Sequence, residues 1–269
     1  MYKRQVSVEN EDEDGDEAVE SSIEALPPVL SRLSRMADLC LSMYFIEAPQ
    51  AAALAAVLGG FTTLTRLHLC CNRFSQDELG DMGMRVLAPA LSRLSRLADL
   101  DLGANNIDAA GAAVLAQPLG ALTSLTALRL SETYVGDAEV EALAPALRRL
   151  SQLAVLDLSF NAIDAAGAAA LAQPLGALAA LTELNLALNK LGDAGAEALA
   201  PALSRLSRLA ILRLQDNDLS DGSLVHLTPA LACLPNLSEL GLLSRNDFSD
   251  AAAAQLRASV RILEHRVPP

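Results

Sequence analysis

The sequence contains no tryptophan, and aromatic residues make up only 3% of its 269 residues. Hydrophobic residues nevertheless account for 52%, which is ample for a buried core. We therefore expect a core built from leucine and alanine rather than from aromatic side chains. Small alanine side chains would also allow helices to pack close against a sheet.

Cysteine is also scarce, because the chain has only Cys40, Cys70, Cys71 and Cys233. This number is too small, and the spacing too irregular, for a disulfide framework. No apolar segment follows the first four residues, so the sequence predicts no signal peptide. An uncharged stretch at 109–128 has the length of a membrane span, but Pro118 and Gly120 interrupt it, which favours a helix followed by a strand. We expect a reducing, cytoplasmic location.

Basic residues are outnumbered, with 20 Lys and Arg against 33 Asp and Glu, giving a net charge of −13. Residues 1–24 hold nine acids and two bases, so this segment alone carries a charge of −7. Such a composition is typical of a solvated, flexible tail. It argues against a nucleic acid or an anionic membrane as partner, because both require a basic surface.

A pattern of the form L-x-x-L-x-L-x-x-N recurs along the rest of the chain. Successive copies are separated by 28 residues, except for one interval of 33, whose extra residues we place in a loop at 75–82. Residues 97–152 and 153–208 are identical at most positions, which indicates duplication of a two-repeat unit. The copies begin at Met36, Leu64, Leu97, Leu125, Leu153, Leu181, Leu209 and Leu237.

The copy at 153–180 shows how one repeat should fold. Alternation over 153–158 predicts a short strand with Leu156 and Leu158 pointing inward. Asp164 is a candidate N-cap for a helix over 165–172, and Pro174 should break or kink that helix. Consecutive strands would then be parallel and joined by helical crossovers.

These residues resemble the leucine-rich repeat family, specifically its ribonuclease-inhibitor-like class with 28-residue repeats. The resemblance implies an α/β solenoid, a horseshoe with parallel strands on the concave face and helices on the convex face, and about eight repeats. It covers residues 25–269, with a degenerate first repeat at 25–63 and a C-terminal capping helix at about 249–266. The family pattern of cysteines in ribonuclease inhibitor is missing, so ribonuclease binding is not expected.

Asparagines at the end of the pattern should satisfy backbone groups in the loops of stacked repeats. Tyr44, Thr133 and Arg245 stand where asparagine is expected, and the last copy has Asn246 one residue later. The expected structural ladder consists of Asn72, Asn105, Asn161, Asn189 and Asn217.

Members of the family mostly bind proteins on the concave face, so side chains that point out of the strands are the candidate site. Asp101, Arg129 and Asp157 should stack across adjacent strands, either as a self-satisfied ion-pair row or as a recognition strip. Phe160 lies in an apolar patch and either anchors a partner or leans into the loop core. The candidate partner-binding residues are Asp101, Arg129, Glu132, Val155, Asp157, Phe160, Glu183, Asn185, Leu188, Ile211, Arg213 and Asp216.

Cys40, His68, Cys70 and Asp101 have the chemistry of metal ligands, but a gently curved sheet does not surround an ion, and we expect neither metal nor cofactor. With three histidines and no phosphate loop, the sequence shows no catalytic set. The leading hypothesis is a non-catalytic protein-interaction module, with a monomer favoured. The alternatives are an adaptor in ubiquitin ligation, since Leu119-Gly-Ala-Leu resembles a "GALA" repeat in a shifted frame, and a GTPase-activating regulator of the same repeat class.

Overall fold

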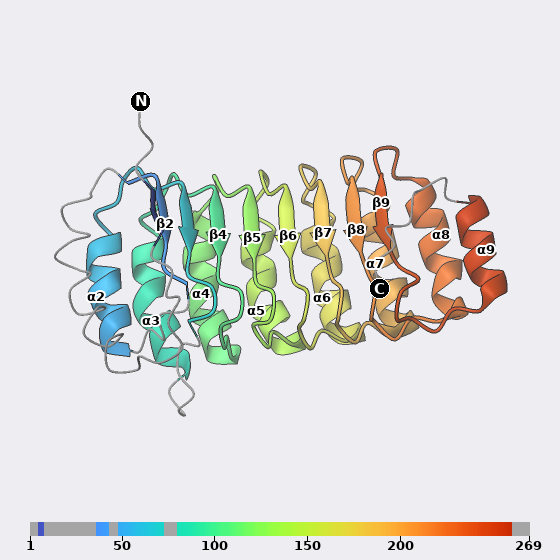
Figure 1. Ribbon diagram of the computed structural model, residues 1–269, viewed down its shortest axis with the longest axis horizontal. Coiled ribbons are helices and arrows are strands. Elements are labelled where there is room, and N and C mark those ends of the chain that lie inside the picture. The colour runs from blue at the N-terminus through green and yellow to red at the C-terminus, as the bar shows by residue number, and fades with distance from the viewer. Residues whose placement is uncertain (1–4, 8–35, 43–47, 73–79, 260–269) are drawn as a thin grey trace.

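A computed structural model describes residues 5–7, 36–42, 48–72 and 80–259, and these form one continuous stack of repeats in two layers, which runs from left to right in Figure 1. One layer is a single parallel sheet, whose strands follow one another in chain order. The other layer consists of helices that run alongside the sheet. Because a packed helix is about twice as wide as the 4.8 Å spacing of strands, the strands lie on the concave face and the helices on the convex face.

Every strand expected from the repeat is present and is three residues long. Residues at equivalent positions of neighbouring repeats pair directly; Leu128, for example, pairs with Leu156. The strands are β2 (Asp38–Cys40), β3 (Arg66–His68), β4 (Asp99–Asp101), β5 (Ala127–Arg129), β6 (Val155–Asp157), β7 (Glu183–Asn185), β8 (Ile211–Arg213) and β9 (Glu239–Gly241).

One further strand, β1 (Gln5–Ser7), pairs in parallel with β2 and lies inside the segment expected to be an acidic tail. The three residues Gln5, Val6 and Ser7 carry no charge, so they can add to the sheet edge before the acidic run begins. The flexible tail at 1–24 is therefore too broad a prediction at these residues, and the rest of that segment lies outside the described residues.

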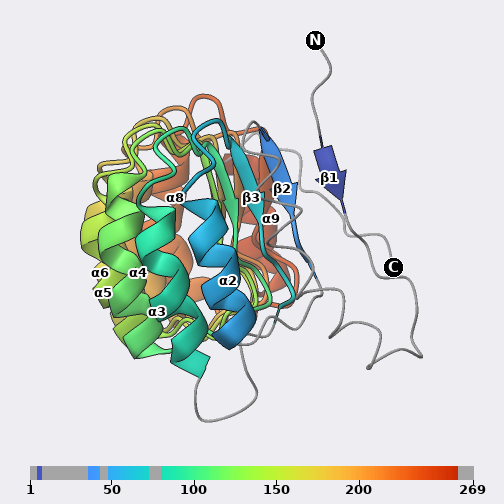
Figure 2. The same ribbon diagram turned by 90° about the vertical axis from the view of Figure 1, so that its left-hand side faces the viewer.

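Helices connect successive strands and pack against their neighbours along the convex layer (Figure 2). α3 begins inside the segment that was expected to be a loop at 75–82, so the prediction was wrong for its last three residues. The helices are α2 (Ala48–Leu58), α3 (Gly80–Leu91), α4 (Ala109–Ala121), α5 (Asp137–Leu147), α6 (Ala165–Leu175), α7 (Gly192–Leu203), α8 (Leu224–Ala232, after a 3-10 turn at Asp221–Ser223) and α9 (Asp250–Ser259).

α6 begins as predicted, with Asp164 accepting a hydrogen bond from the Ala166 amide at 2.6 Å. It does not end before Pro174, however, but continues to Leu175. A proline in the last turn removes only one hydrogen bond, and its fixed φ is compatible with a helix. The same placement recurs in α3, α4, α5, α7 and α8, at Pro89, Pro118, Pro145, Pro201 and Pro229.

The core lies between the two layers and is made almost entirely of leucine and alanine, as the composition predicts. Leu156 and Leu158 point inward and are buried, and Ile163 closes the loop side of the same repeat. Residues 109–128 form α4 and β5 rather than a membrane span. Among the described helices, none has both the length and the apolar character needed to cross a membrane.

α9 covers the last repeat within the expected capping segment, and residues 260–266 of that segment lie outside the described residues. The first repeat is described only in part, through β2 and α2.

Candidate functional site

Asparagine side chains hold together the segments that follow the strands, which we call the loop edge (for example residues 158–167). Asn161 shows the arrangement most completely. Its Nδ2 donates to the carbonyls of Leu130, Leu158 and Ser159 at 2.7 to 3.1 Å. Its Oδ1 accepts from the amides of Thr133 and Val135. One side chain thus satisfies backbone groups of two successive repeats, as Asn72, Asn105, Asn189 and Asn217 also do.

Two of the three positions at which another residue replaces the expected asparagine are described, and the backbone is held by hydrogen bonds at both. Thr133 is fully buried, and its hydroxyl donates to the Leu130 carbonyl at 2.8 Å. In the last repeat Asn246 takes the expected role one residue late, since its Nδ2 donates to Leu214 and its Oδ1 accepts from the amides of Asn217 and Leu219. Tyr44 lies outside the described residues.

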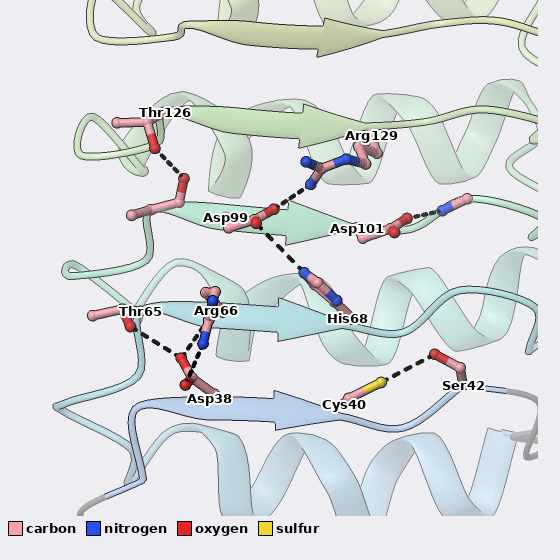
Figure 3. A network of polar contacts seen from close by, with 12 residues as sticks. Asp38, Cys40, Ser42, Thr65, Arg66, His68, Asp99, Asp101, Thr126 and Arg129 are labelled. Carbon is pink, nitrogen blue, oxygen red and sulfur yellow. Dashed lines mark hydrogen bonds and ion pairs between the residues drawn. The ribbon is translucent and has the colours of Figure 1, made fainter. Parts of the chain in front are cut away.

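The side chains that point out of the strands form a second polar surface, which we call the sheet face. At its N-terminal end, Arg66 on β3 binds Asp38 on β2 through two bonds, from Nε at 2.7 Å and from Nη2 at 2.6 Å (Figure 3). This fork geometry is the strong form of an arginine–carboxylate pair. Arg66 itself is exposed, whereas Asp38 is buried.

Asp99 on β4 is the centre of the next cluster, between two basic side chains on the flanking strands (Figure 3). Arg129 Nη1 donates to Asp99 Oδ1 at 2.6 Å, and His68 Nε2 lies 3.6 Å from Asp99 Oδ2. Asp101, Arg129 and Asp157 do lie side by side on adjacent strands, as expected, but the ion pair that Arg129 forms is with Asp99. Arginine is long enough to reach diagonally, and the two expected partners are engaged locally: Asp101 accepts from the Gly103 amide and Asp157 from the Ser159 amide and hydroxyl.

This cluster shifts the titration of both of its weaker ionisable groups. The nearby carboxylate of Asp99 raises the pKa of His68, against the opposing effect of partial burial. Burial alone would raise the pKa of Asp99, but His68 and Arg129 together lower it. The pair is therefore charged over a wider pH range than either group would be alone.

The four residues with metal-ligand chemistry do not converge. Cys40 and Cys70 both face the Ser42 hydroxyl, with Sγ to Oγ distances of 3.4 and 3.0 Å, while His68 turns to Asp99. Burial raises the pKa of the Cys70 thiol, which opposes formation of the thiolate that binds metals. Within the described part of the chain, no group of three or more ligand-type side chains is arranged to hold a metal ion.

At the other end of the sheet face, Arg213 on β8 lies between two glutamates. Its Nη1 is 2.5 Å from Glu183 on β7, and its Nη2 is 2.8 Å from Glu239 on β9. Each of the described arginines on the strands, Arg66, Arg129 and Arg213, is thus paired with at least one carboxylate of the same face.

Apolar side chains gather in the middle repeats, from the strands (Val155 on β6 and Ile211 on β8) and from the adjoining loop edge (Phe160 and Leu188). Phe160 is 55% exposed, which decides between the two interpretations of this residue in favour of an outward orientation. Val155, Leu188 and Ile211 are half-buried. Of the remaining candidates, Asn185 Oδ1 accepts from the Ala187 amide, Asp216 pairs with Arg245 at 3.1 Å, and Glu132 is exposed at the loop edge.

Tyr134 is a further exposed aromatic residue outside the set expected from the sequence; it is 73% exposed and has a φ of +59°. The available signal was an aromatic residue directly after the irregular Thr133, at a place where the sister repeats have Asn106 and Ala162. The strand pattern does not indicate this residue, because its position lies beyond the strand.

The fold and the polar framework define a leucine-rich-repeat solenoid, a class whose concave surface is commonly used for binding. A family model described as "Leucine Rich repeat" matches residues 153–172 and 179–200. The match falls on two regular repeats in the middle of the chain and agrees with the leucine-rich-repeat fold.

Two solved structures share this fold. Internalin C2 from Listeria monocytogenes has 24% sequence identity and a TM-score of 0.51, over 81% of this chain and 84% of that chain. A chain from an octameric complex of Latrophilin 3, Unc5D and FLRT2 (LRR) has 22% identity and a TM-score of 0.50, over 80% of this chain and 55% of that chain. A comparison with curated proteins finds no match. At these identities the likeness concerns the fold alone.

Proposed function

We propose that this chain is a non-catalytic module that binds a protein partner through the concave sheet face. The observation that carries the proposal is the exposed Phe160, which lies at the loop edge beside the middle strands of the sheet face. Water-exposed aromatic side chains beside half-buried apolar ones are typical of binding anchors. On either side of this apolar region, the arginines of the sheet face already form ion pairs with neighbouring carboxylates. A partner can therefore cover these arginines without burying an unpaired charge.

The proposed contact surface keeps the residues identified from the sequence. Their roles differ: the apolar residues would supply the contact area, and the charged residues would set orientation and specificity. They are Asp101, Arg129, Glu132, Val155, Asp157, Phe160, Glu183, Asn185, Leu188, Ile211, Arg213 and Asp216.

The proposal also includes the ribonuclease-inhibitor-like class and an intracellular location. Repeats of 28 residues with a full helix in each support the class. All four cysteines are free thiols, and Cys71 and Cys233 are exposed, which fits a reducing compartment. The complex that contains FLRT2 (LRR) is an assembly of several proteins, in line with a fold that serves protein interaction.

The test is quantitative affinity capture from extracts of the native cell with the wild-type chain and two variants, Phe160→Ala and Arg129→Glu. Both variants should capture less of a partner that binds the sheet face than the wild-type chain does. Val225→Ala is the matched control, because Val225 is 72% exposed but lies on α8 in the convex layer. Partners that bind all variants equally would contradict binding at the sheet face, and loss only with Val225→Ala would place the site on the helices.

A further inference from the structure

Tyr134 is a bulky residue at a backbone position that suits smaller polar residues better. Its neighbours Thr133 and Val135 are fully buried, while its own side chain is the most exposed large hydrophobic one among the described residues. A φ of +59° is unfavourable for a bulky residue, and asparagine or aspartate tolerates it better. Asp218 occurs with this φ at the equivalent place three repeats later. Strain of this kind is retained where a side chain has a use outside the core.

The loop that carries Glu132 and Tyr134 runs alongside the loop of the next repeat, which carries Phe160. The Glu132 amide donates to the Ser159 carbonyl at 3.0 Å, and the Ala162 amide donates to the Val135 carbonyl at 3.0 Å. Residues 132–135 of one repeat therefore run alongside residues 159–162 of the next repeat. Glu132 and Phe160 occupy equivalent positions 28 residues apart, both with φ near +55°, so their side chains leave the loop edge in the same way.

The charges around this point favour a cation. Glu132 is exposed and takes part in none of the ion pairs found among the described residues, whereas Arg66, Arg129 and Arg213 are each paired with carboxylates. The chain as a whole carries a charge of −13, which attracts basic partners. Aromatic faces bind ammonium and guanidinium groups, and a carboxylate adds a charged hydrogen bond.

We propose that Glu132, Tyr134 and Phe160 form an anchor site for a lysine or arginine side chain of the protein partner. The proposal rests on the protein-binding function proposed above and specifies where and how the partner is held. The cation would lie against the aromatic rings, with its N–H groups donating to Glu132. The alkyl stem of the same side chain would continue along the apolar patch next to Leu188.

The experiment selects binders from a phage-displayed library of random 12-residue peptides on the full chain. A synthetic copy of the most enriched peptide is then measured by fluorescence anisotropy. We expect the enriched peptides to share an arginine or lysine next to an apolar residue. Replacing that arginine by citrulline, which is neutral and nearly isosteric, should weaken binding about tenfold (lysine would be replaced by norleucine).

Variants of the chain assign the effect to the three residues. Tyr134→Ser and Phe160→Ser should each weaken binding by about threefold to tenfold, and Val225→Ser should leave it unchanged. In Glu132→Gln the difference in affinity between the arginine and the citrulline peptide should become smaller, because the charged hydrogen bond is lost while the contact of the cation with the aromatic rings remains. Tyr134→Gly should weaken binding and at the same time raise Tm, since it relieves the positive φ, whereas an aromatic with a packing role would lower Tm when removed.

The outcomes separate this proposal from the wider one. Peptides that bind the sheet face, as shown by loss with Ile211→Ser, but tolerate all changes at Glu132, Tyr134 and Phe160 would overturn the anchor site and leave protein binding standing. Enriched peptides without a basic residue would do the same. Failure to enrich any peptide, or binding that only Val225→Ser removes, would contradict both.

Discussion

Polar side chains at the loop edge and on the sheet face are used in opposite ways. At the loop edge, asparagine and aspartate bind backbone groups of their own and of a neighbouring repeat, and four of the asparagines, Asn72, Asn105, Asn189 and Asn217, are buried. On the sheet face, arginine, aspartate and glutamate bind one another while remaining partly exposed. A buried backbone group without a partner is costly, whereas an exposed ion pair contributes little. Of these two sets of polar side chains, those of the loop edge therefore contribute more to stability, and those of the sheet face can vary from repeat to repeat at small cost.

The largest expected effect comes from Asn161→Ala. The substitution removes bonds to three carbonyls and two amides in two repeats. At about 1 kcal/mol for each lost bond to a buried group, and with some access of water, we expect the free energy of unfolding to fall by about 3 kcal/mol. Urea denaturation measures it.

Thr133→Ala is the matched variant at the irregular position of the preceding repeat. It removes the hydroxyl bond to the Leu130 carbonyl, which Asn161 also contacts, so a loss of about 1 kcal/mol is expected. Equal losses for the two variants would contradict the view that the asparagine ladder concentrates the stability of the loop edge.

A second strong effect is expected from Gly167→Ala in the first turn of α6. An added Cβ would lie 2.4 Å from Asp137 Oδ1 and 2.8 Å from Ile163 Cγ2. The Asp137 carboxylate cannot withdraw freely, because it accepts hydrogen bonds from the amides of Asp164 and Gly167. We expect a loss of about 2 kcal/mol, in the range found for overpacking.

Gly176→Ala, at the other end of the same helix, is the control. Its Cβ would meet only ordinary contacts at 3.5 Å or more, so the change should be within about 0.5 kcal/mol. In the background of Asp137→Ala, Gly167→Ala should cost less than in the wild type. A cost that is unchanged there would mean that Ile163, and not the carboxylate, restricts this position.

The sequence predicts the loop edge well and the contacts of the sheet face poorly. The leucines, the asparagine ladder and the Asp164 cap recur with the 28-residue period, so a single copy predicts its neighbours. The pairing of Arg129 with Asp99 could not be predicted, because strand register leaves a long side chain several carboxylates within reach. The exposure of Tyr134 depends on a backbone conformation that the period does not specify. The residues that carry functional information are thus the ones that periodicity describes least well.

A smaller effect is expected on the sheet face from Arg213→Met. The substitution leaves Glu183 and Glu239 without the guanidinium that lies between them, so repulsion adds to the lost attraction. Because all three side chains are partly exposed, a loss of about 1 kcal/mol in the free energy of unfolding is expected. In 1 M NaCl the loss should shrink, since salt screens exposed charges. The loss in Asn161→Ala should not depend on salt, and a reversal of these two dependences would contradict the comparison.

The smallest effect is the pH dependence of the His68–Asp99 pair. The folded-state pKa of His68 is raised, chiefly by Asp99, so its contribution to stability is fully present below the unfolded pKa of about 6.5 and is lost as the pH rises through the folded pKa. The lowered pKa of Asp99 means that its own contribution is present above its unfolded pKa and is lost in acid. The pair should therefore stabilise the fold between about pH 4 and 6.5.

Because His68 is about one-third exposed, the advantage of the wild type over His68→Gln should be only about 0.5 kcal/mol at pH 5.5 and should vanish by pH 8. Urea unfolding at both pH values measures it, and an NMR titration should place the pKa of His68 above 6.5. A pKa at or below that value would contradict the pairing with Asp99. The difference in the free energy of unfolding between the wild type and Asn161→Ala should stay constant over the same pH range, because amide groups do not titrate. If this difference changed with pH as much as the difference for His68→Gln does, the loop edge and the sheet face would not be energetically distinct.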